Sequence, residues 1–202
     1  MADPPSGPRP GTPSTGARRR IPAEGVLEVF VADEQSVHAI DVQRWGDLAR
    51  NVLLAEGIRG DAELSLLFVS HDTMADLNAR FMDGEGPTDV LSFPIEEDLM
   101  ELGRWPDLAT TGPDRSPPDP SDAPLLLGDV VISPEVAAAN APGHAGSFDD
   151  EIALLVVHGV LHILGLDHGD PDEAREMRAK EQDLLARFHG PVAAGTEVPP
   201  EQ

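Results

Sequence analysis

The chain has 202 residues, no cysteine and a formal net charge of −23 at pH 7. This length suffices for one domain with a substantial core, and the lack of thiols excludes disulfide partners and thiolate metal ligands. An acidic surface lowers the expectation of a nucleic-acid substrate, although a bound divalent cation reverses the charge locally. No apolar run approaches the ~20 residues that span a bilayer, so no membrane helix is predicted.

Three segments differ in composition from the rest of the chain. Residues 1–22 are rich in Pro, Gly, Ser and Thr and are predicted to be a disordered tail. Residues 97–124 repeat Pro, Asp, Gly and Ser and are predicted to be a flexible insertion. A second disordered tail is expected at 190–202, which leaves one folded domain at 23–189.

The first half of this domain alternates between strand and helix patterns. In chain order, we expect a strand at 26–31, an amphipathic helix at 41–55, a strand at 62–69, a short helix capped by Ser70 or Asp72, and a strand at 88–93. Pro94 either ends this last strand or places it at a sheet edge.

The second half begins with a strand and then becomes helical. We expect a strand at 125–132 and helices that begin at Ser133-Pro134, at Ser147 and at Asp170-Pro171. Residues 152–164 are apolar almost all round, which predicts a central, buried helix. Early strands and later helices favour an α+β domain, with a small mixed β-sheet packed on helices.

The central helix carries the clearest chemical signal. His158 and His162 are four residues apart, so both rings leave the same helix face. Gly165 allows the helix to stop, and a turn there brings His168 toward them. Three imidazoles that meet form a site for one divalent ion, most naturally Zn²⁺, with an open coordination position. Burial of three rings without such a ligand would leave polar nitrogens without partners.

The spacing of His158 and His162 matches that of the H-E-x-x-H metallopeptidases, whose glutamate is the general base. Gly159 stands at the position of that glutamate. The metal-binding half of the motif is therefore present, whereas its base is absent. A metallopeptidase remains an alternative only if another carboxylate acts as the base.

Four further polar residues are candidates for roles near the metal. Asp167 either orients a ring or accepts a proton as a catalytic residue, or it serves only the turn and the cap between Gly165 and Asp170. Asp129 lies inside an apolar strand and is either a hydrogen-bond partner of a histidine or an acceptor for neighbouring backbone. Asp89 and Ser92 flank a possible substrate groove, although capping and edge-strand solvation explain them nearly as well.

Several segments match one known family in order. They are the His158–His168 segment HGVLHILGLDH, Leu77-Asn78, residues 87–94 and residues 127–133, while Met177 and Glu181 fit the last helix. In these segments the chain resembles the YbeY family of bacterial metal-dependent endoribonucleases, which act in ribosomal RNA maturation. The resemblance covers residues 26–189, apart from the insertion.

The resemblance implies a zincin-like fold with His158, His162 and His168 as ligands of one Zn²⁺ per chain. It also implies a cytoplasmic, single-strand-specific endoribonuclease that hydrolyses RNA phosphodiesters through a zinc-bound water. Its expected partners are an rRNA precursor and ribosomal components. Thr88 joins the groove candidates because it belongs to the matching segment at 87–94.

One position departs from the family pattern. The family commonly has an arginine five residues before Pro87, where this chain has Met82. Arg80, two residues away, is the candidate substitute for substrate handling. Because of this departure and the acidity of the chain, a non-catalytic ribosome-biogenesis factor with a structural zinc ion stays open as an alternative.

Overall fold

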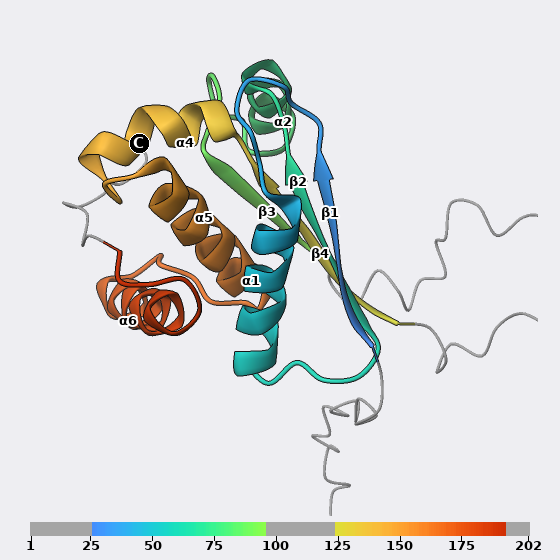
Figure 1. Ribbon diagram of the computed structural model, residues 1–202. Coiled ribbons are helices and arrows are strands. Elements are labelled where there is room, and N and C mark those ends of the chain that lie inside the picture. Colours follow the sequence, from blue (N-terminus) through green and yellow to red (C-terminus); the bar gives the residue numbers. More distant parts are fainter. Residues whose placement is uncertain (1–25, 96–123, 193–202) are drawn as a thin grey trace, which may run out of the picture.

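The computed structural model describes residues 26–95 and 124–192 (Figure 1). Its elements are β1 (Leu27–Asp33), α1 (Val42–Ala55), β2 (Ala62–Phe68), α2 (His71–Phe81), β3 (Val90–Pro94), β4 (Leu125–Ile132), α4 (Pro134–Asn140), the 3-10 helix η2 (Ala141–Gly143), α5 (Phe148–Ile163) and α6 (Pro171–Phe188). The elements follow the predicted order. The predicted tail at 1–22, nearly all of the 97–124 insertion and most of the 190–202 tail lie outside the described residues.

The four strands form one mixed sheet in the order β1-β2-β4-β3. β1, β2 and β4 are parallel neighbours, whereas β3 pairs antiparallel with β4 and forms one edge. Pro94 is the last residue of β3, as expected for a residue that cannot donate to a strand ladder. The predicted small mixed sheet is therefore confirmed.

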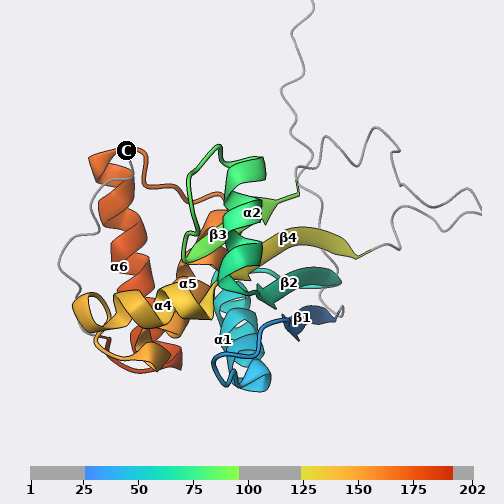
Figure 2. The same ribbon diagram turned by 90° about the horizontal axis from the view of Figure 1, so that it is seen from above.

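Helices cover both faces of the sheet unequally. Helices α1 and α5 lie on one face and α6 packs outside α5 (Figures 1 and 2). The main core lies between these helices and the sheet, and includes Leu64 and Leu66 of β2 and Val130 of β4. A smaller cluster, built on Val131 and on Met74 of α2, lies on the opposite face. This arrangement is the expected single α+β domain.

Helix α5 is the central buried helix that the sequence predicts. Ser147 caps its N-terminus by accepting a hydrogen bond from the backbone N–H of Asp150 at 3.1 Å. Its buried residues occur on all sides, which explains the unbroken apolar run. No helix in the described residues is long and apolar enough to cross a membrane.

Gly159 lets α5 approach the sheet closely. A Cβ atom on this residue would lie 2.5 Å from Cγ1 of Val130 and 3.3 Å from Oγ of Ser92. Ser92 also donates a hydrogen bond to the carbonyl of Gly159 at 3.1 Å. The backbone next to His158 is therefore held against β3 and β4.

Candidate metal centre

The three predicted histidines meet at the C-terminal end of α5. One ligand atom from each of His158, His162 and His168 can be chosen so that all three lie within 4.8 Å of one another. Their ring centroids are 4.5 to 5.6 Å apart. The structure thus brings together the three histidines that the sequence singled out.

The turn at Gly165 brings His168 to the other two rings. Gly165 has a φ of 84°, a conformation that favours glycine. Its N–H bonds to the carbonyl of His162 and the N–H of Leu166 bonds to that of Leu161, at 2.9 and 3.1 Å. This pair of bonds is a Schellman motif, which ends α5 and reverses the chain.

The arrangement fits a divalent metal ion. The Nε2 atoms of His158 and His162 lie 3.1 Å apart. Two nitrogen ligands at about 2.0–2.1 Å from a tetrahedral zinc ion are separated by about 3.3 Å, so little rearrangement is required. Three neutral nitrogen donors suit Zn²⁺ and other divalent transition metals, and they leave the full charge on the ion.

The environment keeps His162 neutral at physiological pH. Burial of the ring, followed by the repulsion of His158 and His168, lowers its pKa from 6.5 to about 4. Asp167 and the backbone of Leu166 oppose this shift but do not cancel it. A neutral imidazole retains the lone pair that a metal ion requires.

A partner that the sequence reasoning did not assign completes the site. The carboxylate of Glu181, on α6, accepts a hydrogen bond from Nδ1–H of His158 at 2.7 Å. The sequence held a signal for this contact, because Glu181 falls on the apolar stripe of α6 with Met177, Leu184 and Leu185. A carboxylate on a buried helix face requires a polar partner.

The predicted groove residues of β3 and β4 are divided between the two faces of the sheet. Ser92 faces α5 and bonds to Gly159. Asp129 alternates with Val130 and therefore faces away from α5, in register with Ser65 and Phe93. Within the described residues no hydrogen bond joins Asp129 to a histidine of the site, and the carboxylate that does so is that of Glu181.

Asp167 lies next to the histidines but bonds to backbone. Its Oδ1 accepts a hydrogen bond from the N–H of His168 at 2.7 Å, which is turn chemistry. The residue is exposed, and its charge raises the pKa of His162, so its carboxylate acts on the site electrostatically.

Thr88 and Asp89 organise the start of β3. Oδ1 of Asp89 accepts hydrogen bonds from the N–H of Val90 and from the hydroxyl of Thr88, at 2.9 and 3.3 Å. Oδ2 of Asp89 accepts another from Nδ2 of Asn140 at 3.2 Å, which ties β3 to α4. These contacts anchor the start of β3.

Arg80 and Met82 lie at the C-terminal end of α2, and both are exposed. The guanidinium of Arg80 lies 5.4 Å from the centroid of the Phe81 ring, which in turn packs edge-on against Phe93 at 5.3 Å. Met82, at the position of the family's arginine, is 49% exposed, so an apolar side chain stands at the surface there.

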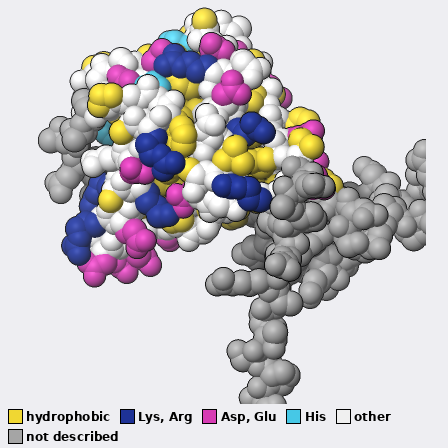
Figure 3. Space-filling model, turned by 60° about the horizontal axis from the view of Figure 1, so that its bottom comes forward, with side chains coloured by type: hydrophobic (Ala, Val, Ile, Leu, Met, Phe, Trp, Pro, Cys, Tyr) yellow, Lys and Arg dark blue, Asp and Glu magenta, His cyan; other side chains and the backbone are white. Residues whose placement is uncertain are grey.

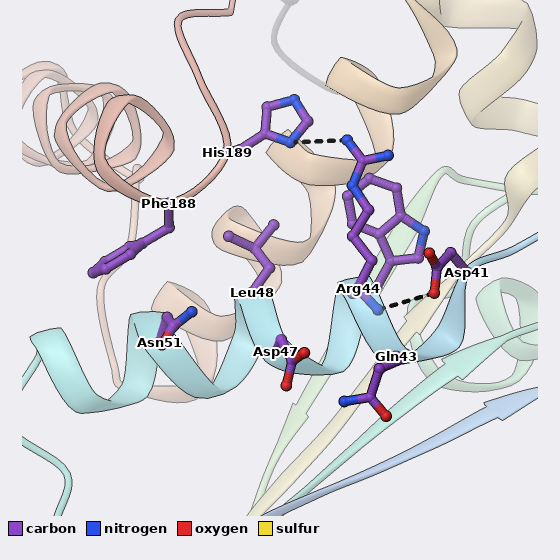
Figure 4. A pocket seen from close by; sticks show the side chains of 9 residues that line it. Asp41, Gln43, Arg44, Asp47, Leu48, Asn51, Phe188 and His189 are labelled. Atoms are coloured by element: carbon purple, nitrogen blue, oxygen red, sulfur yellow. Dashed lines mark hydrogen bonds between the residues drawn. The ribbon is translucent and has the colours of Figure 1, made fainter.

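A separate pocket lies between α1 and the end of α6, with a volume of about 410 Å³ (Figure 4). None of the predicted site residues lines it. Nδ1 of His189 lies 3.5 Å from the guanidinium of Arg44, and its Nε2 bonds to Asp150 at 2.8 Å. The bonds from Ser147 and His189 lower the pKa of Asp150. These contacts join α1, α5 and α6.

The surface is not uniformly acidic. On the face shown in Figure 3, Lys and Arg side chains stand apart from one another, with hydrophobic and acidic side chains between them. The described residues include eight basic side chains: Arg44, Arg50, Arg59, Arg80, Arg175, Arg178, Lys180 and Arg187. No large basic patch is visible on this face.

The fold and the site together define an α+β protein whose central helix and following turn present three histidines that can hold one metal ion. Residues 30–189 match the family model described as Endoribonuclease YbeY. The chain therefore belongs to the YbeY endoribonuclease family, as its motifs indicated.

Individual relatives agree with this assignment. The chain is 43% identical to Endoribonuclease YbeY of Frankia casuarinae over 164 residues, which cover 81% of this chain and 76% of that protein. It is 45% identical to Endoribonuclease YbeY of Thermobifida fusca over 160 residues, covering 79% and 93% respectively. The solution structure of TM1509 from Thermotoga maritima is similar in fold, with a TM-score of 0.50 and 23% identity over 81% of this chain and 90% of that one.

Proposed function

We propose that this protein is a metal-dependent endoribonuclease that hydrolyses single-stranded RNA and acts in rRNA processing and ribosome maturation. The observation that carries the proposal is the convergence of His158, His162 and His168 in a member of the YbeY endoribonuclease family. We further propose that the ion is one Zn²⁺ per chain and that the protein works in the cytoplasm with an rRNA precursor and ribosomal components. The functional domain is assigned to residues 23–189.

His158, His162 and His168 would hold the ion through their ring nitrogens. When bound, the zinc ion lowers the pKa of a coordinated water toward ~7 and offsets negative charge on a phosphate. His162 supports this role because its lowered pKa keeps its nitrogen available at neutral pH. The exposed carboxylate of Asp167 is assigned the acceptance of a proton, since it lies beside the histidines.

The remaining candidates take different roles in this proposal. Arg80 is the exposed cation among them and is assigned a phosphate contact. Thr88, Asp89 and Ser92 fix the course of β3 through their backbone contacts. Asp129 lies on the face of the sheet opposite α5 and is assigned no contact with the metal.

The geometry disfavours a metallopeptidase. In that class the residue after the first histidine supplies the general base. Here the Cβ direction of Gly159 points at Val130 of the sheet, at a distance of 2.5 Å. A side chain at this position would therefore enter the core rather than reach a substrate.

The test is cleavage of a labelled single-stranded RNA by the zinc-loaded protein, beside His162→Ala and the matched control His71→Ala. His71 is exposed and its ring is paired with Asp72, away from the site. We expect the control to cleave like the parent and His162→Ala to lose cleavage while remaining folded. Equal cleavage by all three would contradict the proposal. Zinc binding without cleavage would favour the non-catalytic binding factor.

A further inference from the structure

Glu181 is a buried carboxylate on a helix that contributes no metal ligand. It is 8% exposed and lies on the apolar face of α6 with Met177, Leu184 and Leu185, which are 1 to 2% exposed. Burial of a carboxylate is unfavourable unless polar partners compensate for the lost water. Its hydrogen-bond partner within the described residues is the ring of His158.

The two nitrogens of His158 point to two different partners. Nδ1 lies 2.7 Å from Oε1 of Glu181, whereas Nε2 lies 3.1 Å from Nε2 of His162. A neutral imidazole carries one proton, and a carboxylate accepts but does not donate. The bond to Glu181 therefore requires the proton on Nδ1, which leaves the lone pair of Nε2 directed at the centre.

We propose that Glu181 is a positioning residue for the metal centre, which fixes the tautomer and the ring orientation of His158. This inference rests on the proposed metal centre. A carboxylate in this position also raises the basicity of the ligand ring. Removal of such a partner typically weakens metal affinity by about 10- to 100-fold.

The same chain contains a matched pair for comparison. Glu151 is fully buried and accepts a hydrogen bond from Nδ1 of His144 at 2.9 Å, on the first turn of α5. It also accepts one from the backbone N–H of Ala145 at 3.1 Å. His144 is not among the three converging histidines. Loss of charge at Glu151 therefore weakens a buried His–Glu contact without acting on the centre.

The experiment measures Zn²⁺ affinity by chelator competition for the parent, Glu181→Gln, Glu181→Ala and Glu151→Gln. We expect Glu181→Ala to bind zinc about 10- to 100-fold more weakly. Glu181→Gln retains an acceptor but loses the charge, so its loss of affinity should be smaller. Glu151→Gln should bind zinc within about twofold of the parent, because its contact is remote from the three histidines.

The second readout is independent of the metal and of catalysis. ¹⁵N NMR of the metal-free protein reports which nitrogen of His158 carries the proton. We expect the Nδ1–H form in the parent and in Glu151→Gln, and a shift toward Nε2–H in Glu181→Ala. Glu181→Met, which fills a similar volume but offers no strong acceptor, replaces Glu181→Ala in both measurements if Glu181→Ala fails to fold.

The outcomes separate this inference from the proposed function. If the parent binds zinc but folded Glu181→Ala binds it equally well, or if the tautomer is unchanged, the positioning role is overturned and the metal centre stands. If the parent binds no zinc, both are overturned. Equal losses in Glu181→Gln and Glu151→Gln would assign both glutamates to general stability and would also overturn the role.

Discussion

Replacement of Gly159 by alanine should destabilise the protein, although alanine is the better helix former. Gly159 lies inside α5, where exchange of glycine for alanine normally stabilises a helix by about 1 kcal/mol. The added Cβ, however, would lie 2.5 Å from Cγ1 of Val130. That separation is about 1 Å shorter than ordinary carbon contacts.

The size of this destabilisation depends on whether Val130 or the helix can move to relieve the overlap. Val130 is fully buried in β4, and its β-branched side chain has little rotamer freedom. The helix itself is held to β3 by the bond from Ser92 to Gly159. Overpacking of a core costs about 1–3 kcal/mol, and these constraints place the cost near the upper end. After subtraction of the helix-propensity gain, we expect a net loss of about 2 kcal/mol.

Urea unfolding of the metal-free protein measures this loss. Gly143→Ala is the matched control, because a Cβ on Gly143 meets no atom within 4 Å. The Gly159→Ala/Val130→Ala double variant should be less destabilised than the sum of the two single variants, since the smaller side chain relieves the overlap. A Gly159→Ala protein as stable as the parent would refute the reasoning.

Four further predictions follow from the site and its supports. Because the pKa of His162 falls from 6.5 to about 4 on folding, the unfolded chain binds the extra proton between these values. The contribution of His162 to the free energy of unfolding of the metal-free protein should therefore be fully present above pH 6.5 and should decrease by about 1 kcal/mol at pH 5. Urea unfolding at a series of pH values measures this dependence, and His162→Gln should make it weaker. Zinc at 100 times its Kd should add about 2.7 kcal/mol to the free energy of unfolding, measured by thermal melting, and His168→Ala should abolish this increment. Asp170→Ala removes the capping box that Asp170 forms with Glu173 and should cost about 1 kcal/mol in the same melts, and an unchanged melting temperature would contradict this. Four described arginines form no ion pair within the described residues, so log K for RNA should fall with log salt with a slope of magnitude about 3, and a far steeper slope would contradict so small a set of phosphate contacts.

The helices and strands could be predicted from residues close to one another in the sequence. Asp41, Ser70 and Asp170 each cap a helix in the structure with side-chain acceptors that the sequence displays. Gly165 ends α5 because it adopts a left-handed backbone conformation, which glycine favours and which a single residue in the sequence therefore indicates. The spacing of His158 and His162 places both rings on one helix face. Prediction of the metal site therefore needed only one further feature, the turn that follows α5.

The remaining features depend on how distant segments pack. The strand order places β4 between β2 and β3, and no local pattern specifies that order. β4 is apolar on both faces, because α5 and α2 cover opposite sides, so its sequence did not reveal which way Asp129 points. The partner of His158 is 23 residues away on α6, and the contact exists only once α6 has docked.

The ion pairs of the described basic residues bear on how an acidic chain can bind RNA. Among the described basic residues, Arg44, Arg175, Lys180 and Arg187 already form ion pairs with carboxylates. Within the described residues, four basic side chains thus remain for phosphate, and Met82 takes the place of another at the family's arginine position. In the proposed metal centre, three imidazole donors without charge of their own would leave the full charge of a bound divalent ion near the phosphate. Under the proposed function, the described residues would then attract RNA mainly at the metal centre rather than over the whole surface.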